Sequence, residues 1–389
     1  MERFEKSFTR QEPIPEAGIA AATEVMRSGI LHRYGADPSH VAALEAEFAA
    51  QIGAAHAIAV ASGGYAMGCA LRALDVQPGE PVLTNAWTLA PVPGAIAATG
   101  ARPLLVEVGE DLTIDLEDLA AKAPQARLLM LSHMRGHLAD MERLMAVCDT
   151  HGVTVIEDCA HTMGASWNGH PSGRWGAVGC FSTQTYKHVN SGEGGLIVTD
   201  DPDLAARMVL MSGSYMLYGR HGAAPSEEVF ARHTAQMPNV SGRMDELRAA
   251  ILRPQIADLP LQAKRWNDRY RILEEAFRAT PGLKMIERPQ QEAFVGSSIQ
   301  VLAAHAETLP GFVDGCAARG VEWKWFGADR PQGFTSAHAH WGYVEAQTLP
   351  RTDAILSRLL DMRVPLTFDA EDCARIGRIV ADEAARHLA

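Results

Sequence analysis

The sequence has no excess of basic residues and no long uninterrupted apolar run. Its 389 residues include 35 Lys and Arg against 47 Asp and Glu, which leaves a formal net charge of −12. Nucleic acids and anionic membrane surfaces are bound by clustered Lys and Arg, so we expect neither as a partner. The most apolar stretch, residues 86–101, is broken by Pro91, Pro93, Gly94 and Gly100. It is therefore too interrupted to span a bilayer.

Cysteine is scarce, and no two cysteines form a C-x-x-C pair. A disulfide framework needs more closely grouped cysteines, so we expect reduced thiols. Residues 1–6 are charged and lack the apolar core of a signal peptide, and we expect a cytoplasmic protein. Hydrophobic residues make up 47% and charged residues 21%, which excludes a disordered chain. The cysteines are Cys69, Cys148, Cys159, Cys180, Cys316 and Cys373.

Short apolar runs alternate with helical stretches from about residue 40 to residue 200. This alternation predicts an α/β fold with a mostly parallel sheet covered by helices on both faces. Such sheets bind ligands at the carboxyl ends of their strands. The expected helices are 41–48, 64–74, 87–98 and 140–150. The expected strands are 56–60, 81–84, 103–108, 127–131, 153–156, 179–182 and 195–199.

The second part of the chain has shorter elements. Residues 241–279 are helical and charged, with Pro254 and Pro260 as expected kinks. We therefore expect a large cofactor-binding domain over residues 1–250 and a smaller C-terminal α+β domain over residues 251–389. In the latter we expect a strand at 298–302 and helices at 309–319, 350–360 and 371–388.

Two charged residues come soon after expected strands. Asp158 comes after the strand at 153–156, and Lys187 follows the strand at 179–182 among hydroxyl and apolar residues. Burial lowers the pKa of a lysine amine and makes it a nucleophile for a carbonyl group. Each residue also has a common structural explanation. Asp158 could cap a helix, and Lys187 could be an ordinary surface lysine.

Two other features lie at neighbouring strand ends. Gly63 and Gly64 form a strand-to-helix turn, whose free N–H groups suit a phosphate, although an ordinary tight turn has the same residues. Trp87 follows the strand at 81–84 and could stack on a planar ring, although core packing is the usual role of tryptophan.

These features together require a ligand with a phosphate, an aromatic ring, a ring nitrogen that needs an anion and an aldehyde that needs an amine. Pyridoxal 5'-phosphate satisfies all four requirements. Asp158 would keep the pyridine nitrogen protonated, and Lys187 would condense with the aldehyde. The phosphate and the ring face would be contacted by Gly63, Gly64, Ser182 and Trp87.

The order and spacing of these motifs resemble the DegT/StrS-type sugar and cyclitol aminotransferases. That resemblance implies the fold-type I aminotransferase architecture. It extends from about Tyr34 to Leu247, and more loosely through the C-terminal part. The strongest motifs are Glu157-Asp158-Cys159-Ala160-His161, Gly179-Cys180-Phe181-Ser182, Lys187 and Gly192-Glu193-Gly194-Gly195.

The resemblance implies a pyridoxal-phosphate-dependent aminotransferase. Its partners would be small molecules, with glutamate or glutamine as donor and a keto or aldehyde sugar, cyclitol or related acceptor, including anionic ones. Lys187, Asp158 and His161 would be catalytic, with His161 beside the ring and its 3-hydroxyl. Tyr34 would contact the substrate. The resemblance also implies a homodimer with shared active sites.

The chain departs from the family pattern at four places. Gly63-Gly64 replaces Gly-Thr, and Ala177 replaces an acidic residue. Ser241 replaces the Asn that reaches the phosphate of the neighbouring subunit, with Asn239 as the other candidate for that role. A His-Leu-Tyr-Gly run reads His133-Met134-Arg135-Gly136 here.

The last departure suggests a substrate contact. Arg135 follows the expected strand at 127–131 and offers a planar fork for a carboxylate, phosphate or sulfonate. We therefore hypothesise that it binds an anionic group of a substrate. The alternative is a structural ion pair, for example with Asp140.

Three other functions are compatible with the resemblance. A dehydratase of this family would carry a histidine at the lysine position, where this chain has Lys187 followed by His188. An aromatising synthase would keep the lysine. A non-catalytic sensor on the same fold would not need Lys187, Asp158 and His161 together.

Overall fold

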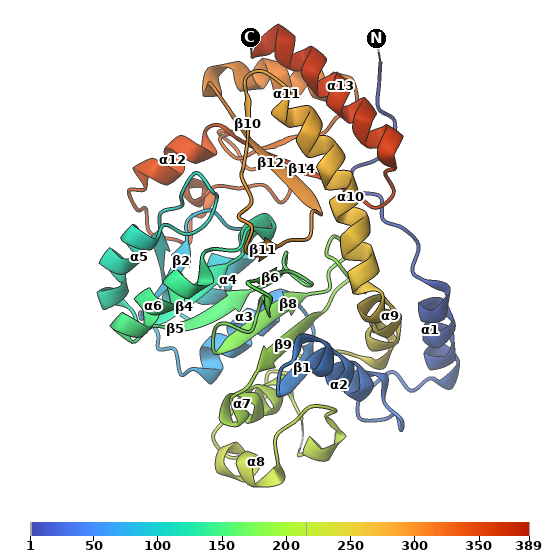
Figure 1. Ribbon diagram of the computed structural model, residues 1–389. Helices are drawn as coiled ribbons and strands as arrows, with labels where there is room; N and C mark the ends of the chain where they lie inside the picture. The colour runs from blue at the N-terminus through green and yellow to red at the C-terminus, as the bar shows by residue number, and fades with distance from the viewer. Residues whose placement is uncertain (1, 215, 389) are drawn as a thin grey trace.

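A seven-stranded sheet forms the centre of the computed structural model, which describes residues 2–214 and 216–388 (Figure 1). Its strand order is β1-β9-β8-β5-β4-β2-β3. Strand β9 is antiparallel to both of its neighbours, and the other pairs are parallel. Six strands therefore end at one edge of the sheet. The strands are β1 (His56–Val60), β2 (Pro81–Asn85), β3 (Arg102–Val106), β4 (Leu128–Ser132), β5 (Thr154–Asp158), β8 (Val178–Ser182) and β9 (Gly195–Thr199).

Helices cover both faces of this sheet because apolar side chains point to both sides along each strand. Ile58 and Val60 pack with α3, α4 and α7 on one face, while Ala57 and Ala59 pack with α2 and α9 on the other. Helices α5 and α6 cover the second face nearer to β3. The helices are α2 (His40–Ile52), α3 (Gly63–Ala73), α4 (Pro91–Ala97), α5 (Leu116–Lys122), α6 (Met141–His151), α7 (Pro202–Ser212), α8 (Glu227–His233) and α9 (Glu246–Ala257).

The C-terminal part forms a second layer, at the top of Figure 1. A four-stranded antiparallel sheet has the order β10-β12-β14-β13, and its apolar side packs against α10, α11 and α13. Its elements are β10 (Leu283–Met285), β12 (Ser298–Ala303), β13 (Lys324–Trp325), β14 (Leu359–Arg363), α10 (Leu259–Arg278), α11 (Leu309–Ala318), α12 (Pro350–Leu356) and α13 (Ala370–His387).

The first residues of the chain join this second layer. Phe4 and Phe8 lie in its core, where their rings pack edge-to-face on Phe368 at centroid distances of 4.9 and 5.0 Å. The chain then crosses to the large sheet through α1 (Glu16–Ser28), which packs on α9. A small sheet of β6 (Ser166–Trp167), β7 (His170–Pro171) and β11 (Glu292–Ala293) connects the two layers.

Most expected elements are confirmed within a residue or two, but three helices differ. The helix expected at 41–48 continues to Ile52. The helix expected at 87–98 begins only at Pro91, because residues 87–90 form a bent loop. The helix expected at 350–360 ends at Leu356, and β14 begins at Leu359. Pro254 lies inside α9, whereas Pro260 lies in the first turn of α10, where proline is tolerated.

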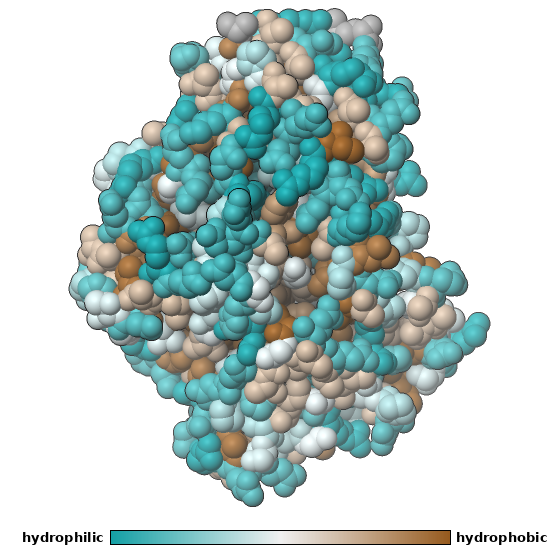
Figure 2. Space-filling view, in the orientation of Figure 1, coloured by the Kyte–Doolittle hydropathy of each residue, from teal (hydrophilic) through white to brown (hydrophobic). Residues whose placement is uncertain are grey.

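Hydrophilic side chains dominate the face of the molecule shown in Figure 2, with smaller apolar patches between them. Among the described residues, none of the helices combines the length and the apolar character needed to cross a bilayer.

Candidate active site

Two adjoining cavities, of about 360 and 110 Å³, open at the carboxyl edge of the large sheet. The larger cavity is bounded by the last residues of β5 and β8, Asp158 and Ser182, and by the start of α3. The structure therefore brings together residues that are far apart in the sequence, as expected for the carboxyl ends of parallel strands. The residues shared by both cavities are Arg135, His161, Tyr186, Lys187 and Arg363.

Lys187 reaches into this space from the loop after β8. Burial lowers the pKa of its amine to about 7, opposed by the negative charge of Asp158 and assisted by the positive charges of Arg135 and others nearby. The Nζ atom lies 2.8 Å from Nε2 of His161. At neutral pH a large share of the Lys187 amine is therefore unprotonated, which is the form that attacks a carbonyl carbon.

His161 is held in one tautomer by its surroundings. Burial and the neighbouring Lys187 keep the pKa of the imidazole well below its usual range, so the ring is neutral. The backbone N–H of Arg135 donates to Nδ1 at 3.3 Å. Because Nδ1 accepts, the single ring proton is on Nε2, which donates to the lone pair of the Lys187 amine.

Asp158 is oriented by polar residues at the ends of neighbouring strands. The Ser132 hydroxyl donates to its Oδ2 at 2.9 Å, and the N–H of Ala160 donates to Oδ1 at 3.1 Å. Ser132 is itself fixed by Asn85, which accepts its backbone N–H, and by the hydroxyl of Thr88. Our sequence reasoning missed these three supporting residues. Their signal is a polar residue at or just after the end of each strand.

The turn before α3 provides unused backbone donors. The Ser62 hydroxyl accepts the N–H of Tyr65 at 3.0 Å, whereas the N–H groups of Gly63 and Gly64 lie at the helix start, where no intrahelical partner exists. A Cβ on Gly63 would lie 2.9 Å from Cβ of Ser182. Only glycine therefore allows these two segments of the chain to approach so closely. The Ser182 hydroxyl adds a third donor toward the same cavity, so the three groups suit a phosphate.

Trp87 is not among the residues that line either cavity, and its expected contact with a bound ring stays a prediction. It is 1% exposed and packs edge-to-face on Phe326 at 5.7 Å. Its indole therefore belongs to the core between the two layers. Leu89, two residues further along the same loop, lines the larger cavity together with Met134.

Arg135 lines both cavities and also forms an ion pair. Its Nη2 lies 2.9 Å from Oδ2 of Asp361, and its side chain is 5% exposed. The pair is with Asp361 rather than with Asp140, which caps α6 through the N–H of Arg143. The backbone of Arg135 is left-handed (φ 55°), in the short turn η2 (Met134–Gly136) after β4.

Tyr34 and Ser241 lie apart from both cavities of this chain. The Tyr34 hydroxyl is 2.8 Å from Nε2 of His221, within a buried group that includes the ion pair of Arg33 and Glu45. Ser241 is exposed, and its backbone N–H donates to the side chain of Asn239 at 3.0 Å. Tyr34 and Ser241, which we expected at the site, therefore lie away from Lys187 within one chain.

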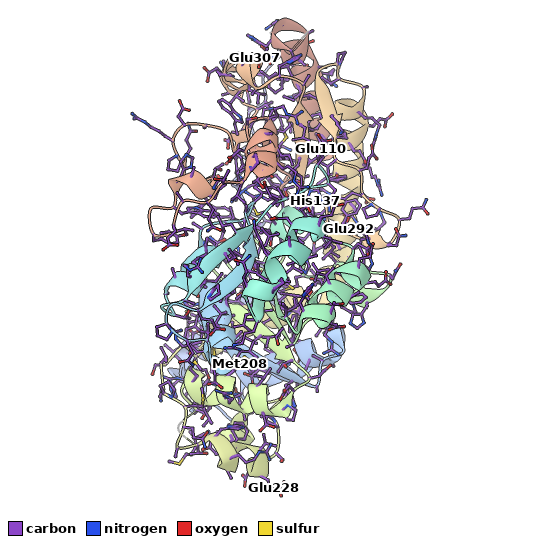
Figure 3. The ribbon with its side chains drawn as sticks, turned by 90° about the vertical axis from the view of Figure 1, so that its left-hand side faces the viewer. Glu110, His137, Met208, Glu228, Glu292 and Glu307 are labelled. Carbon is purple, nitrogen blue, oxygen red and sulfur yellow. The ribbon has the colours of Figure 1, made fainter. Side chains whose placement is uncertain are left out.

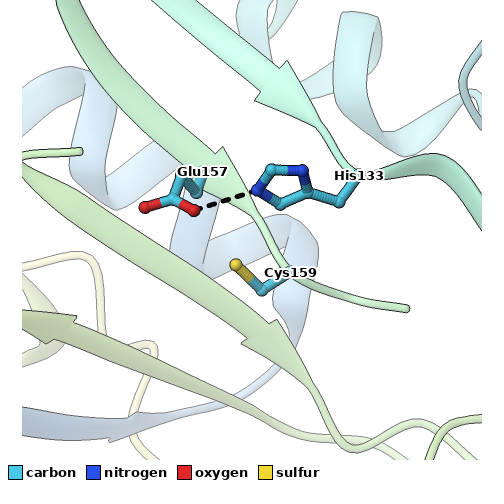
Figure 4. Close-up of side chains that lie close together, drawn as sticks. All are labelled: His133, Glu157 and Cys159. Carbon is cyan, nitrogen blue, oxygen red and sulfur yellow. Dashed lines mark hydrogen bonds and ion pairs between the residues drawn. The ribbon is translucent and has the colours of Figure 1, made fainter. Parts of the chain in front are cut away.

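A second polar cluster lies behind the site, formed by His133, Glu157 and Cys159 (Figure 4). Such a group could hold a metal ion, but the carboxylate of Glu157 already accepts four hydrogen bonds. Its donors are His133 Nε2 and the N–H groups of Gly173, Trp175 and Gly176, at 2.8 to 2.9 Å. All lone pairs in the carboxylate plane are occupied, so Glu157 ties β5 to the following loop.

The strand β14 contributes two charged residues that our sequence reasoning missed. Asp361 is fully buried and accepts from the Gln300 amide at 2.8 Å, while Lys324 lies 3.3 Å from its Oδ2. Gln300 in turn contacts Nε2 of His137 at 2.8 Å, at the level where the two layers meet in Figure 3. Arg363, two residues after Asp361, lines both cavities.

The chain is similar in sequence to known aminotransferases. A sequence model of the DegT/DnrJ/EryC1/StrS aminotransferase family matches residues 13–381. The chain is 36% identical over 253 residues to dTDP-3-amino-3,4,6-trideoxy-alpha-D-glucose transaminase of Streptomyces venezuelae, covering 64% of this chain and 61% of that protein. It is 33% identical over 253 residues to L-glutamine:2-deoxy-scyllo-inosose aminotransferase of Streptomyces kanamyceticus, covering 64% and 59%. The matched stretch thus spans about three fifths of these relatives' length.

The fold agrees over almost the whole chain with solved structures. The crystal structure of 3-amino-5-hydroxybenzoic acid synthase has a TM-score of 0.82 and 26% sequence identity, covering 97% of this chain and 99% of that chain. The expected fold-type I aminotransferase architecture is therefore confirmed.

Proposed function

This chain belongs to the DegT/DnrJ/EryC1/StrS aminotransferase family, and from that membership we propose that it is an aminotransferase. The amino donor is glutamate or glutamine, and the acceptor is a keto or aldehyde sugar, cyclitol or related compound. The names of two relatives, a dTDP-aminosugar transaminase and a glutamine-dependent inosose aminotransferase, support this substrate class.

The proposed cofactor is pyridoxal 5'-phosphate, and the residues around the larger cavity fit it. The start of α3 and Ser182 would hold the phosphate, and Asp158 would face the pyridine nitrogen. When bound, this cofactor supplies an electron-withdrawing ring and an aldehyde that accepts an amine. Trp87 is the proposed contact of the ring face, and Leu89 of the same loop lines the larger cavity.

Lys187 and His161 are the residues that move and position protons. The neutral amine of Lys187 is a base that accepts a proton from a carbon atom in the cavity, because its pKa of about 7 lies near working pH. Nε2 of His161 lies 2.8 Å from that amine and positions it beside the cavity, and this hydrogen bond must open before the lone pair accepts a proton. Ser132 fixes the orientation of the Asp158 carboxylate.

The observation that carries the proposal is the buried amine of Lys187, next to neutral His161 and in one cavity with Asp158. A purely structural lysine would not be placed without a direct carboxylate partner at the carboxyl edge of the sheet.

Replacing Lys187 tests the proposal. Lys187→Ala should abolish amino transfer, and borohydride should no longer attach a pyridoxyl group at position 187, as detected by peptide mass spectrometry. The matched control is Lys264→Ala, since Lys264 is 70% exposed and does not line either cavity. Unchanged turnover in Lys187→Ala, or an unlabelled wild-type Lys187, would refute the proposal.

An aromatising synthase is the second candidate. Its support is the similarity to 3-amino-5-hydroxybenzoic acid synthase over almost the full chain. Such an enzyme would release water from a cyclic keto acid and form a product with aromatic ultraviolet absorbance. An aminotransferase would return a saturated amine from the same ring.

We further propose a cytoplasmic homodimer whose active sites are shared between subunits. Its support is the position of Tyr34 and Ser241 away from the cavities of their own chain, together with exposed apolar residues near α1. Met26 is 56% exposed, and Ile30 and Leu31 are each 45% exposed.

A further inference from the structure

Positive charges outnumber negative ones on the wall shared by the two cavities. Arg135 and Arg363 line this wall beside Lys187, and Lys324 lies behind them. Among the described residues, Asp361 is the only carboxylate that pairs with Arg135, and it is shared with Lys324. A wall of this kind is electrostatically unfavourable until an anion enters it.

Arg363 has no ion-pair partner in the part of the chain that the structure describes. Its guanidinium carbon lies 4.0 Å from the ring centroid of Tyr186, which supports the flat face of the group. Its Nη1 atom is buried and has no hydrogen-bond partner among the described residues. A buried N–H of a charged group that lacks an acceptor is costly, and native structures keep few of them.

Arg135 also has hydrogen-bond donors without an acceptor among the described residues. Its side chain is 5% exposed, and the distance of 2.9 Å to Asp361 brings the charges together without a well-formed hydrogen bond. Both Nε and Nη2 of Arg135 are buried without an acceptor. Two guanidinium groups with unused N–H donors thus face the same space as the amine of Lys187.

We propose that Arg363 and Arg135 form a subsite that binds a carboxylate group of the substrate. A planar carboxylate accepts two parallel hydrogen bonds from a guanidinium, which matches the stacked, flat presentation of Arg363. The start of α3 is reserved for the cofactor phosphate, so the subsite lies on the substrate side of Lys187. This inference rests on the proposed aminotransferase function and adds a charged group to the substrate it takes.

The carboxylate that binds in this subsite could belong to either of two substrates. The amino donor has one next to its reacting carbon, and a keto-acid acceptor would have one on its ring or chain. The chemistry of recognition is the same for both, so the two half-reactions must be measured separately.

Matched pairs of small molecules distinguish these sources. For the acceptor, protein loaded with pyridoxamine phosphate is mixed with 3-oxocyclohexane-1-carboxylate or with its neutral carboxamide. For the donor, protein loaded with pyridoxal phosphate is mixed with L-alanine or L-alaninamide. The cofactor absorbance gives the rate of each half-reaction at several concentrations.

The variants are Arg363→Gln, which removes the charge, and Arg363→Lys, which keeps the charge but loses the planar fork. Arg278→Gln is the matched control, because Arg278 is an exposed arginine that pairs with Glu287 outside the cavities. Arg363 is preferred to Arg135 because its loss leaves no buried carboxylate unpaired.

We expect wild-type protein to prefer the carboxylate over the amide in one pair by about 10- to 100-fold, the usual effect of hydrogen bonds to a charged group. Arg363→Gln should abolish this preference, Arg363→Lys should keep part of it, and Arg278→Gln should keep all of it. A preference confined to the ketones assigns the subsite to the acceptor, and one confined to the amino acids assigns it to the donor.

The inference is overturned if wild type shows no preference in either pair, or if Arg363→Gln retains it in full. Failure of the underlying function looks different: the protein loaded with pyridoxal phosphate would then not react with glutamate or glutamine either, and borohydride would not label Lys187.

Discussion

The Lys187 side chain illustrates how a single buried amine gains reactivity at the cost of stability. Burial and the positive charges of Arg135, Arg363 and Lys324 disfavour the protonated amine. Only Asp158 opposes these effects among the principal contributors. The amine is therefore nucleophilic near neutral pH, but folding must bring it out of water without a direct counter-ion.

Lys187→Met should stabilise the cofactor-free protein. The folded-state pKa of Lys187 is about 7, below its ordinary value of 10.5, so the unfolded chain binds more protons between these two values. Wild-type stability consequently rises with pH through this window, and the full penalty is present below pH 7. We expect the variant to be more stable by about 1–3 kcal/mol at pH 6, once the contribution of the lost contact with His161 is subtracted.

The measurement is urea unfolding of both proteins without cofactor, at pH 6 and pH 9. The difference should shrink by about 2 kcal/mol at the higher pH, because the folded wild type then holds a neutral amine, which costs less to deprotonate at pH 9 than the charged amine costs to bury at pH 6. Lys264→Met, at an exposed position, should show no such pH dependence. A constant difference at both pH values would contradict the lowered pKa.

The placement of single residues was predictable only where a strand determines it. Asp158 and Ser182 are the last residues of β5 and β8, so alternation and topology place them at the sheet edge. Trp87 lies in an irregular loop, where sequence does not tell which side chain turns toward the ligand. In this loop the indole of Trp87 is buried in the core, and Leu89 lines the larger cavity.

At the scale of elements, the two glycines at the start of α3 differ in how closely they approach the neighbouring strand. Gly63 faces Ser182 on the neighbouring strand, with 2.9 Å between that side chain and a hypothetical Cβ. For Gly64 the nearest atom to such a Cβ is Oγ of Ser62, at 3.9 Å. Two adjacent glycines of the same turn therefore have different steric freedom.

Gly63→Ala should lower stability by about 1–3 kcal/mol, because the β8 backbone must move to accept the methyl group. Gly64→Ala should leave both the stability and the binding of pyridoxal phosphate nearly unchanged, because the added methyl group has only Oγ of Ser62 within 4 Å and the backbone N–H is kept. Thermal unfolding without cofactor and titration with cofactor measure the two effects. Equal destabilisation by both substitutions would contradict the close approach of Gly63, but not Gly64, to β8.

The predicted bounds of helices and strands were wrong mainly in the second layer, and the reason is physical. Residues 350–363 contain apolar residues at helical spacing, and the sequence alone does not show where the helix ends. In the folded protein Leu360 and Met362 face the C-terminal core, while Asp361 and Arg363 face the other side. This period of two was the available signal for β14, and missing the strand meant missing both charged residues.

At the scale of the whole molecule, two hydrophobic cores are joined by α10 and by the beginning of the chain. The long helix α10 rises between the layers in Figure 1 and contributes Tyr270, Leu273 and Phe277 to the upper core. Phe4 and Phe8 complete that core from the opposite end of the sequence. The C-terminal layer is therefore not built from residues 251–389 alone, whatever boundary best describes the domains.

Phe4→Ala should destabilise this C-terminal layer more than the large sheet. Phe4 is 4% exposed, its ring packs on Phe8 and Phe368, and its N–H donates to the carbonyl of Arg319 at 2.8 Å. Removing the ring leaves a cavity among residues that cannot close it fully, which costs about 3–5 kcal/mol. Amide hydrogen exchange should therefore accelerate in α13 and β12 before it does in β4 and β5. Phe334→Ala, at a 68% exposed ring, should change stability by less than about 0.5 kcal/mol. Uniform acceleration throughout both layers would instead show that the two cores unfold as one cooperative unit.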